Sequence, residues 1–372
     1  MLAQASFSAI TIGLAVLAPA LREEYGLSLG QVGVLLSAAW LGATVTLLPW
    51  GLTADRYGER VVLVIGLLGS AACLVGAANA GSFEALFALL VLAGAAGASV
   101  NSASGRAVMH WFRPDERGFA LGIRQTAIPI GGLVVAIVLP GLAETGGSEA
   151  AFLFLAACSA VGALVGGLVL RGRDNGHDLE VESLARTLRD RRLWRLSLGS
   201  ALYLYAQVAV IGFGVLFLHD EHGLSNSEAA LVIAAAQVLA IALRIGGGHW
   251  SDVVGSRIEP MRRAGLALAA ALVITALLAG GPLWLLVPAV ALAGGLSMAW
   301  NGLSFTAAAE LAGTARSGAA IGFQQTVLSG LGVLAPVVFA TSVSSASWSA
   351  AFVLAGAVTL VGWGTLRPLR AY

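Results

Sequence analysis

Charge is scarce in this sequence, and lysine is missing from it. Only 11% of the 372 residues are charged, against about 25% in an ordinary soluble domain. All 21 basic residues are arginine and the net charge is +1, so there is no basic tail of the kind that binds nucleic acid. Hydrophobic residues make up 58% of the chain, more than a water-soluble fold can use. The sequence therefore predicts a protein that lies within a lipid bilayer and has no nucleic-acid partner.

Cysteine is also scarce, and motifs of common enzyme classes are missing. Cys73 and Cys158 fall in apolar segments without a CxxC spacing, so we interpret them as small packing residues. The sequence has no Walker loop and no HExxH motif. The run HDEH at residues 219–222 lies in a short loop, where solvated charge is more usual than a metal site. We therefore expect no enzyme, no cofactor and no bound metal.

Apolar segments of 18 residues or more recur along the chain, each long enough to cross a hydrocarbon core of about 30 Å. Charge clusters and turn residues divide them into twelve expected transmembrane helices, at 2–21, 30–53, 60–80, 84–111, 117–142, 149–170, 194–218, 226–249, 261–280, 283–309, 315–342 and 347–366. The fold class is therefore an all-α membrane protein. The one long polar stretch predicts a short amphipathic helix on the membrane surface. We expect an N-terminal six-helix bundle at 1–171, a cytoplasmic linker at 172–193 and a C-terminal six-helix bundle at 194–372.

Arginine placement predicts the orientation of these helices. The even-numbered loops and the C-terminus hold 17 arginines, whereas the odd-numbered loops hold only Arg22. By the positive-inside rule the even-numbered loops face the cytoplasm, and so do both termini. We expect a multi-pass monomer in the inner, cytoplasmic membrane of the cell.

Short motifs recur at a nearly constant separation in the two halves. The pattern G-x3-D-x2-G-x-R occurs at residues 51–60 and again at 248–257, and its positions differ by 197. Gly-Leu-Ser precedes the same helices at 26–28 and 223–225, and a second match pairs residues 117–126 with 316–326, where Gln125 and Gln325 differ by 200. Because the two copies occupy equivalent loops, the halves have the same orientation. Such a parallel repeat is typical of alternating-access carriers.

The run GLTADRYGER at residues 51–60 resembles the loop 2–3 signature of the major facilitator superfamily, and residues 248–257 are its weaker copy. The resemblance covers the whole chain. It implies two pseudo-symmetric six-helix bundles around a central cavity that opens alternately to each side. The signature residues are then expected to act in gating; they are Gly51, Asp55, Arg56, Gly58, Arg60, Gly248, Asp252 and Arg257.

Two further likenesses concern the substrate. Residues 122–132 resemble helix 5 of a branch that includes cyanate-type and other small-anion carriers. The pattern R-x3-G-x2-S-D that begins at Arg244 is similar to helix 8 of monocarboxylate transporters, where the arginine engages the substrate carboxylate. The arginine that many proton-coupled members carry in helix 4 is absent, because residues 89–97 are apolar or glycine.

Polar residues within the spans gather on particular helices. They concentrate on expected helices 1, 4, 7 and 10 and their neighbours, as expected if these helices line a cavity and every third helix faces lipid. Helix 1, for example, carries Gln4, Ser8 and Thr11 on one face. The candidate substrate-binding residues are Arg124, Arg244, Arg106, Gln125, Asn301, Gln325, Tyr203, Gln207, Gln237, Asn101 and Trp300.

Three of these candidates are arginines inside spans that carry no Asp or Glu near mid-membrane. Arginine stays protonated in proteins, so each needs an anion, backbone carbonyls or water as partner. Two interpretations are open. Arg124 or Arg244 could bind a substrate carboxylate or oxyanion; alternatively, Arg106 could pair with Asp55, and Arg244 with Asp252 or with carbonyls at a helix end.

The residues therefore predict a carrier for a small, anionic solute, either an organic carboxylate or an inorganic oxyanion. The alternative is an exporter of neutral or acidic amphipathic compounds, whose cavity would be larger and more apolar. The expected partners are this solute, the lipid bilayer and, for a symporter in which the anion brings its own proton, protons. Exchange and facilitated diffusion are equally compatible with the sequence.

Overall fold

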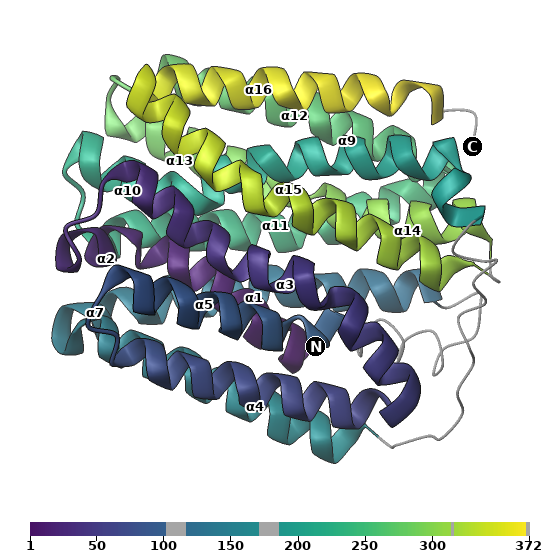
Figure 1. Cartoon of the computed structure of the whole chain (residues 1–372). Helices are drawn as coiled ribbons and strands as arrows, with labels where there is room; N and C mark the ends of the chain where they lie inside the picture. The colour runs from purple at the N-terminus through teal and green to yellow at the C-terminus, as the bar shows by residue number, and fades with distance from the viewer. Residues whose placement is uncertain (102–116, 171–185, 314–315, 370–372) are drawn as a thin grey trace.

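The computed structural model describes residues 1–101, 117–170, 186–313 and 316–369. These residues form helices and no strand, and the helices lie side by side in one bundle (Figure 1). In order, the helices are α1 (Leu2–Val16), α2 (Ala18–Glu24), α3 (Leu29–Tyr57), α4 (Glu59–Ala78), α5 (Phe83–Gly97), α7 (Arg117–Val169), α9 (Arg191–Gln207), η1 (Val208–Gly212), α10 (Phe213–His222), α11 (Asn226–Val254), α12 (Ile258–Leu277), α13 (Leu283–Ser297), α14 (Trp300–Ala312), α15 (Ser317–Ser345), α16 (Trp348–Thr365) and η2 (Arg367–Leu369).

The described helices account for the twelve expected spans. Ten are long and apolar enough to cross a membrane, or eleven if α1 and α2, which meet at a bend of 57°, form one span. The remaining span comes from α7, whose 53 residues would extend about 80 Å if straight. Its backbone leaves the helical region at Gly146 and Gly147. A Cβ at Gly13 of α1 would lie within 3.2 Å of both Leu139, which precedes the break, and Leu155, which follows it. Both parts of α7 therefore pack against the same point of α1. The chain must reverse at the break, so α7 crosses the membrane twice.

Several spans expected to be continuous are broken. The first bends at Leu17 between α1 and α2, and the seventh contains the π-helical turn η1. The fourth and tenth turn at Ala98 and Met298, two positions that differ by 200 as the repeat requires. The seventh span begins at Arg191, three residues before its predicted start, because the Asp190 side chain caps it by accepting from the Arg192 N–H at 3.0 Å.

Most of the predicted amphipathic linker helix lies outside the described residues. Within the described part of that stretch, residues 186–189 are helical.

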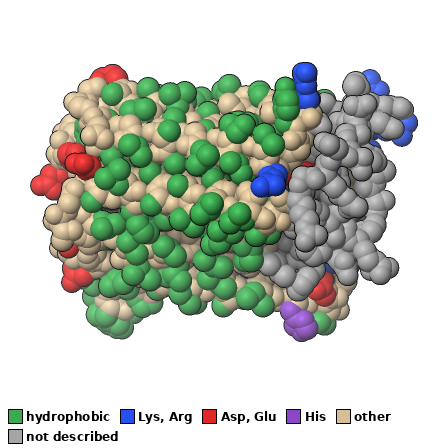
Figure 2. Space-filling view, turned by 90° about the horizontal axis from the view of Figure 1, so that it is seen from below, with side chains coloured by type: hydrophobic (Ala, Val, Ile, Leu, Met, Phe, Trp, Pro, Cys, Tyr) green, Lys and Arg blue, Asp and Glu red, His purple; other side chains and the backbone are tan. Residues whose placement is uncertain are grey.

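The side surface of the bundle is apolar and its two ends are charged. Figure 2 shows hydrophobic side chains covering the flank, with acidic side chains gathered at one end and arginines at the other. Large apolar side chains such as Leu168, Leu277 and Trp284 are more than 70% exposed there. A surface of this kind is stable in lipid rather than in water. We call the two ends the arginine-rich and the arginine-poor end.

The two halves are held together at the arginine-poor end. Arg22 of α2 forms an ion pair with Asp220 of α10. Ser227 of α11 donates a hydrogen bond to a Glu144 carboxylate oxygen of α7, at 2.7 Å. At the same end, the N-terminal half packs tightly on the C-terminal half, because a Cβ at Gly33 of α3 would lie 2.8 Å from a backbone oxygen of α15. The central cavity is therefore closed on this side.

The repeated Gly-Leu-Ser motif forms the same turn twice. Gly26 and Gly223 have φ of 62° and 64°, and the serine that follows each by two residues caps the next helix. Ser28 exchanges hydrogen bonds with Gln31, and Ser225 does so with Glu228, so both helices begin with a capping box.

The repeated loop motif also needs glycine at one position. Gly58 joins α3 to α4 with φ of 81° and ψ of 159°, and Gly255 ends α11 with φ of 67° and ψ of 25°. These residues occupy equivalent places in the two motif copies. The left-handed conformation of Gly255 is unfavourable for other residues, and that of Gly58 is open almost only to glycine.

We expect Gly58→Ala to destabilise the protein by about 2 kcal/mol and Gly255→Ala by about 1 kcal/mol. Thermal unfolding of the detergent-purified protein measures both. Gly364→Ala in α16 is the matched control, because a Cβ there meets nothing within 4 Å and the backbone is helical. Equal melting temperatures for the three variants would contradict the assignment of strain to the loop glycines.

Candidate substrate-binding site

A central cavity of about 120 Å³ lies between the two halves. Six carboxamide side chains line it, three from each half: Gln4, Asn101, Gln125, Gln207, Asn301 and Gln325. Each carboxamide offers two N–H donors and one C=O acceptor. The cavity wall is therefore neutral but rich in hydrogen-bond donors.

The repeat places two of these amide pairs on opposite walls. Asn101 and Asn301 differ by 200 positions, and so do Gln125 and Gln325. Each asparagine follows the turn in its span, at Ala98 or Met298, by three residues. The separation of 200 could have identified the asparagine pair from sequence, but the turns could not be seen there, because nothing in the apolar pattern marks them.

Arg124 lies behind the amides of the N-terminal half. Its side chain is buried, and Nη2 donates to Oε1 of Gln4 at 3.0 Å and to Oδ1 of Asn101 at 3.5 Å. Gln4 Nε2 also donates to Asn101 Oδ1, at 3.4 Å. Because these contacts occupy the carbonyl oxygen of Asn101, its N–H groups are the part that remains for the cavity.

Arg244 lies behind the amides of the C-terminal half. Its Nε donates to the Met298 backbone oxygen at 2.8 Å, and Nη2 donates to Asn301 Oδ1 at 2.5 Å. Nη1 donates to the backbone oxygen of Gln125 on α7. Asn301 in turn donates a hydrogen bond from Nδ2 to Gln207 Oε1, at 3.5 Å.

All the described partners of Arg244 are neutral oxygens. The predicted pairing of Arg244 with Asp252 is wrong, because Asp252 pairs with Arg257 instead. The predicted pairing with a carbonyl at a helix end is confirmed, since Met298 follows the last residue of α13. In this conformation the cavity-lining side chains include neither Arg124 nor Arg244, so both stand one layer behind the wall.

The remaining candidates divide into lining and packing residues. Trp300 and Gln325 line the cavity. Tyr203 and Gln237 are fully buried outside it: Tyr203 packs edge-on against Trp300, with ring centres 6.3 Å apart, and Gln237 packs on Gly132. Helical periodicity placed both on an inward face, but it does not distinguish packing between helices from exposure to a cavity. Arg106 lies outside the described residues.

Apolar residues also line the cavity, and sequence reasoning missed them. They include Ile12, Ala15, Leu36, Ile211, Leu328 and Pro336. The π-helical turn η1 contributes here, next to Gln207. Such turns are frequent at functional sites.

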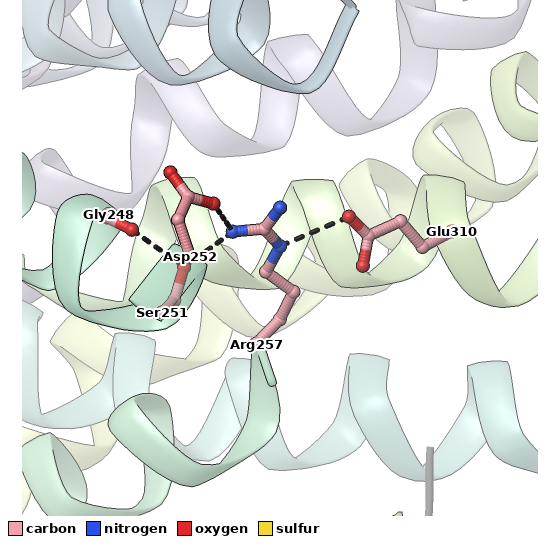
Figure 3. A network of polar contacts seen from close by, with 5 residues as sticks. All are labelled: Gly248, Ser251, Asp252, Arg257 and Glu310. Atoms are coloured by element: carbon pink, nitrogen blue, oxygen red, sulfur yellow. Dashed lines mark hydrogen bonds and ion pairs between the residues drawn. The ribbon is translucent and has the colours of Figure 1, made fainter. Parts of the chain in front are cut away.

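The second loop motif forms a polar network at the arginine-rich end (Figure 3). Arg257 forms an ion pair with Asp252, and its Nε donates to Glu310 Oε1 at 3.0 Å. Its Nη1 also donates to Ser251 Oγ at 2.6 Å, and Ser251 in turn donates to the Gly248 carbonyl. Burial lowers the pKa of Arg257, but the two carboxylates outweigh it and raise the pKa above its ordinary value. Glu310 was not among the predicted gating residues; it is distant in sequence from Arg257, and the fold brings the two together.

In the first motif copy, Arg56 lies over the Tyr57 ring at 5.4 Å and Arg60 is exposed. Gly51 has open space where a Cβ would be. The Asp55 side chain lies outside the described part of the structure. The predicted Arg106–Asp55 pair therefore stays a prediction.

Comparison with known proteins identifies the family. The family model described as Major Facilitator Superfamily matches residues 1–336. An uncharacterised MFS-type transporter of Mycobacterium tuberculosis is 35% identical over 364 residues, which cover 96% of this chain and 81% of the relative.

Several relatives are named for a substrate, and two of them are as follows. A probable nitrate/nitrite antiporter of Thermus thermophilus is 31% identical, covering 65% of this chain and 57% of its own length. A probable sulfoacetate transporter of Cupriavidus necator is 26% identical, covering 96% and 89%.

Solved structures share the fold. A bacterial homologue of the human lysosomal transporter Spinster, in an inward-facing and occupied conformation, superposes with a TM-score of 0.76 at 18% identity. The match covers 100% of this chain and 93% of that one. With twelve spans in two halves, a central cavity and this family match over most of its length, the chain belongs to the major facilitator superfamily and is a multi-pass membrane transporter, not an enzyme.

Proposed function

We propose that this transporter carries a small anion by alternating access through the central cavity. The observation that carries the proposal is Arg244: a buried cation, 7% exposed, whose described partners are all neutral oxygens. Burying an ion without a counter-charge is costly, and an anion that enters the cavity supplies the missing charge.

The carboxamide side chains that line the cavity, here called the amide wall, extend the effect of this charge to the cavity. Asn301 binds Arg244 through its oxygen, and one of its two N–H groups donates to Gln207 Oε1, which leaves the other N–H as a donor on the cavity side. A hydrogen bond from a cation polarises an amide, so its N–H groups become better donors. Two opposite charges about 5 Å apart attract by roughly 3 kcal/mol at an effective dielectric constant of about 20. The site therefore favours anions even though the guanidinium lies one layer back.

The names of two relatives support an anionic substrate. Nitrate, nitrite and sulfoacetate are all anions, and the relatives named for them match 65% and 96% of this chain. They differ in size and in whether they carry an organic body. The shared property is the negative charge, which is also what the amide wall selects.

A second candidate function rests on the apolar part of the cavity. Leu36, Ile211 and Leu328 offer a surface for the body of a neutral or acidic amphipathic compound. An exporter of such compounds would use the same cavity but would not depend on Arg244. The experiments below separate the two functions.

We place the carrier in the inner membrane of the cell, as a monomer with the arginine-rich end in the cytoplasm. Among the described residues, no Asp or Glu lines the cavity. Transport coupled to protons would therefore use the proton that the anion brings.

We expect anions to stabilise the purified protein against heat, with nitrate and sulfoacetate as probes and tetraphenylphosphonium as the cationic comparison. At a concentration of 100 Kd, binding adds about 2.7 kcal/mol to the free energy of unfolding. Arg244→Gln should remove this stabilisation, because Gln keeps donors but has no charge. Arg263→Gln, at an exposed arginine of α12, is the control and should keep it. Stabilisation by the cation alone would refute the anion site.

We expect Asn301→Asp to weaken anion binding at least tenfold. The new carboxylate would lie beside Arg244, in place of the oxygen that is now 2.5 Å from Nη2, and would neutralise the guanidinium. Asn301→Ser, which removes the amide without adding charge, should weaken binding less. Equilibrium binding of sulfoacetate to the purified variants measures both, and equal affinity of Asn301→Asp and the wild type would contradict the proposal.

A further inference from the structure

One hydrogen bond of Arg244 crosses from one half of the protein to the other. Met298 and Asn301 belong to the same half as Arg244, but Gln125 belongs to α7 in the N-terminal half. The Nη1 group therefore connects the two halves at the wall of the cavity, which Gln125 also lines.

The Gln125 carbonyl is free to accept this bond because of a proline. In a regular helix, the carbonyl of residue 125 accepts a hydrogen bond from the N–H of residue 129. Residue 129 is Pro129, which has no N–H and lies inside α7. A buried carbonyl without a donor is strongly disfavoured, so the guanidinium of the other half fills a vacancy that the proline creates.

The bond lies on a seam between α7 and α11. Seven residues from Gln125, a Cβ at Gly132 would lie 2.7 Å from the Gln237 side chain, and Gln237 is seven residues from Arg244. Two helical turns therefore separate two contacts on the same pair of faces. The Gly132–Gln237 contact lies outside the cavity, whereas Gln125 lines it. Of the two contacts, the Arg244–Gln125 bond is the one that involves a residue of the cavity wall.

We propose that Pro129 is a positioning residue: it keeps the Gln125 carbonyl available to hold Arg244 in the empty carrier, and the substrate anion displaces this carbonyl from Nη1. The inference rests on the proposed anion transport. Both oxygens can accept a hydrogen bond from the guanidinium, but the anionic oxygen is also attracted by its full opposite charge, so it wins the exchange. The exchange breaks the link between the halves, and binding is thereby coupled to their relative motion.

The first test is Pro129→Ala. The alanine restores the N–H, which satisfies the Gln125 carbonyl within α7, so the anion no longer competes with it for Nη1. We expect sulfoacetate and nitrate to bind about tenfold more tightly, which corresponds to about 1.4 kcal/mol. Equilibrium binding to the purified protein measures this. Unchanged or weaker binding would overturn the proposal.

Two controls separate this effect from a general effect of proline removal. Pro140→Ala, in the same helix but outside the cavity wall, should leave the affinity unchanged. In an Arg244→Gln background, Pro129→Ala should not restore anion binding, because the donor for which the carbonyl and the anion compete is gone. A tenfold gain in either control would contradict the exchange at Nη1.

A second measurement needs no substrate. In the empty carrier, Pro129→Ala removes a link that holds the halves together while the arginine-poor end is closed. We expect a several-fold faster reaction of a membrane-impermeant maleimide with Thr11→Cys, a position on the cavity wall, in a Cys73→Ser, Cys158→Ser background. An unchanged rate would overturn the proposal. If anion binding survives Arg244→Gln, the anion function fails, whereas this rate reports on the link alone.

Discussion

The buried guanidinium of Arg244 constrains everything around it. A permanent charge in a low-dielectric interior needs oxygens, and the spans of this chain supply no carboxylate at that depth. Departures from regular helix supply them instead: the turn at Met298 and the proline at position 129 each release a backbone carbonyl. Irregular backbone is tolerated at membrane depth where protein or a cavity surrounds it. The breaks are thus part of the charge site.

The two halves have cavity-lining amides at equivalent repeat positions, but their buried arginines are not at equivalent positions. Asn101 and Asn301 are equivalent by the repeat, yet the guanidinium behind one comes from the fifth span and that behind the other from the eighth. The repeat position of Arg124 is Gln324 in the other half, which is fully buried and bonds Ser304 at 2.5 Å. A symmetric scaffold therefore carries an asymmetric distribution of buried charge, and the buried Arg244 bonds across the boundary between the halves, to Gln125.

Composition, repeats and arginine placement predicted the spans and the two halves, and helical periodicity placed several of the carboxamides on inward faces. These features depend on hydrophobicity and local spacing, which the sequence displays directly. The layering of the site depends on tertiary contacts, and it was not predicted: Arg244 stands behind Asn301, and Tyr203 and Gln237 pack between helices. A helical period assigns a side chain to a face, but a face can meet another helix as well as a cavity. The turn at η1 lies in an apolar run that carries no signal for it.

The paired capping boxes have a consequence for how the chain enters the bilayer. Ser28 with Gln31, and Ser225 with Glu228, close rings of only a few residues. Such short rings can form as soon as their residues leave the ribosome, before any partner helix exists. The second helix of each half would then begin at a fixed residue while the chain is still being synthesised. Later assembly would join helix pairs whose depth in the lipid is already set.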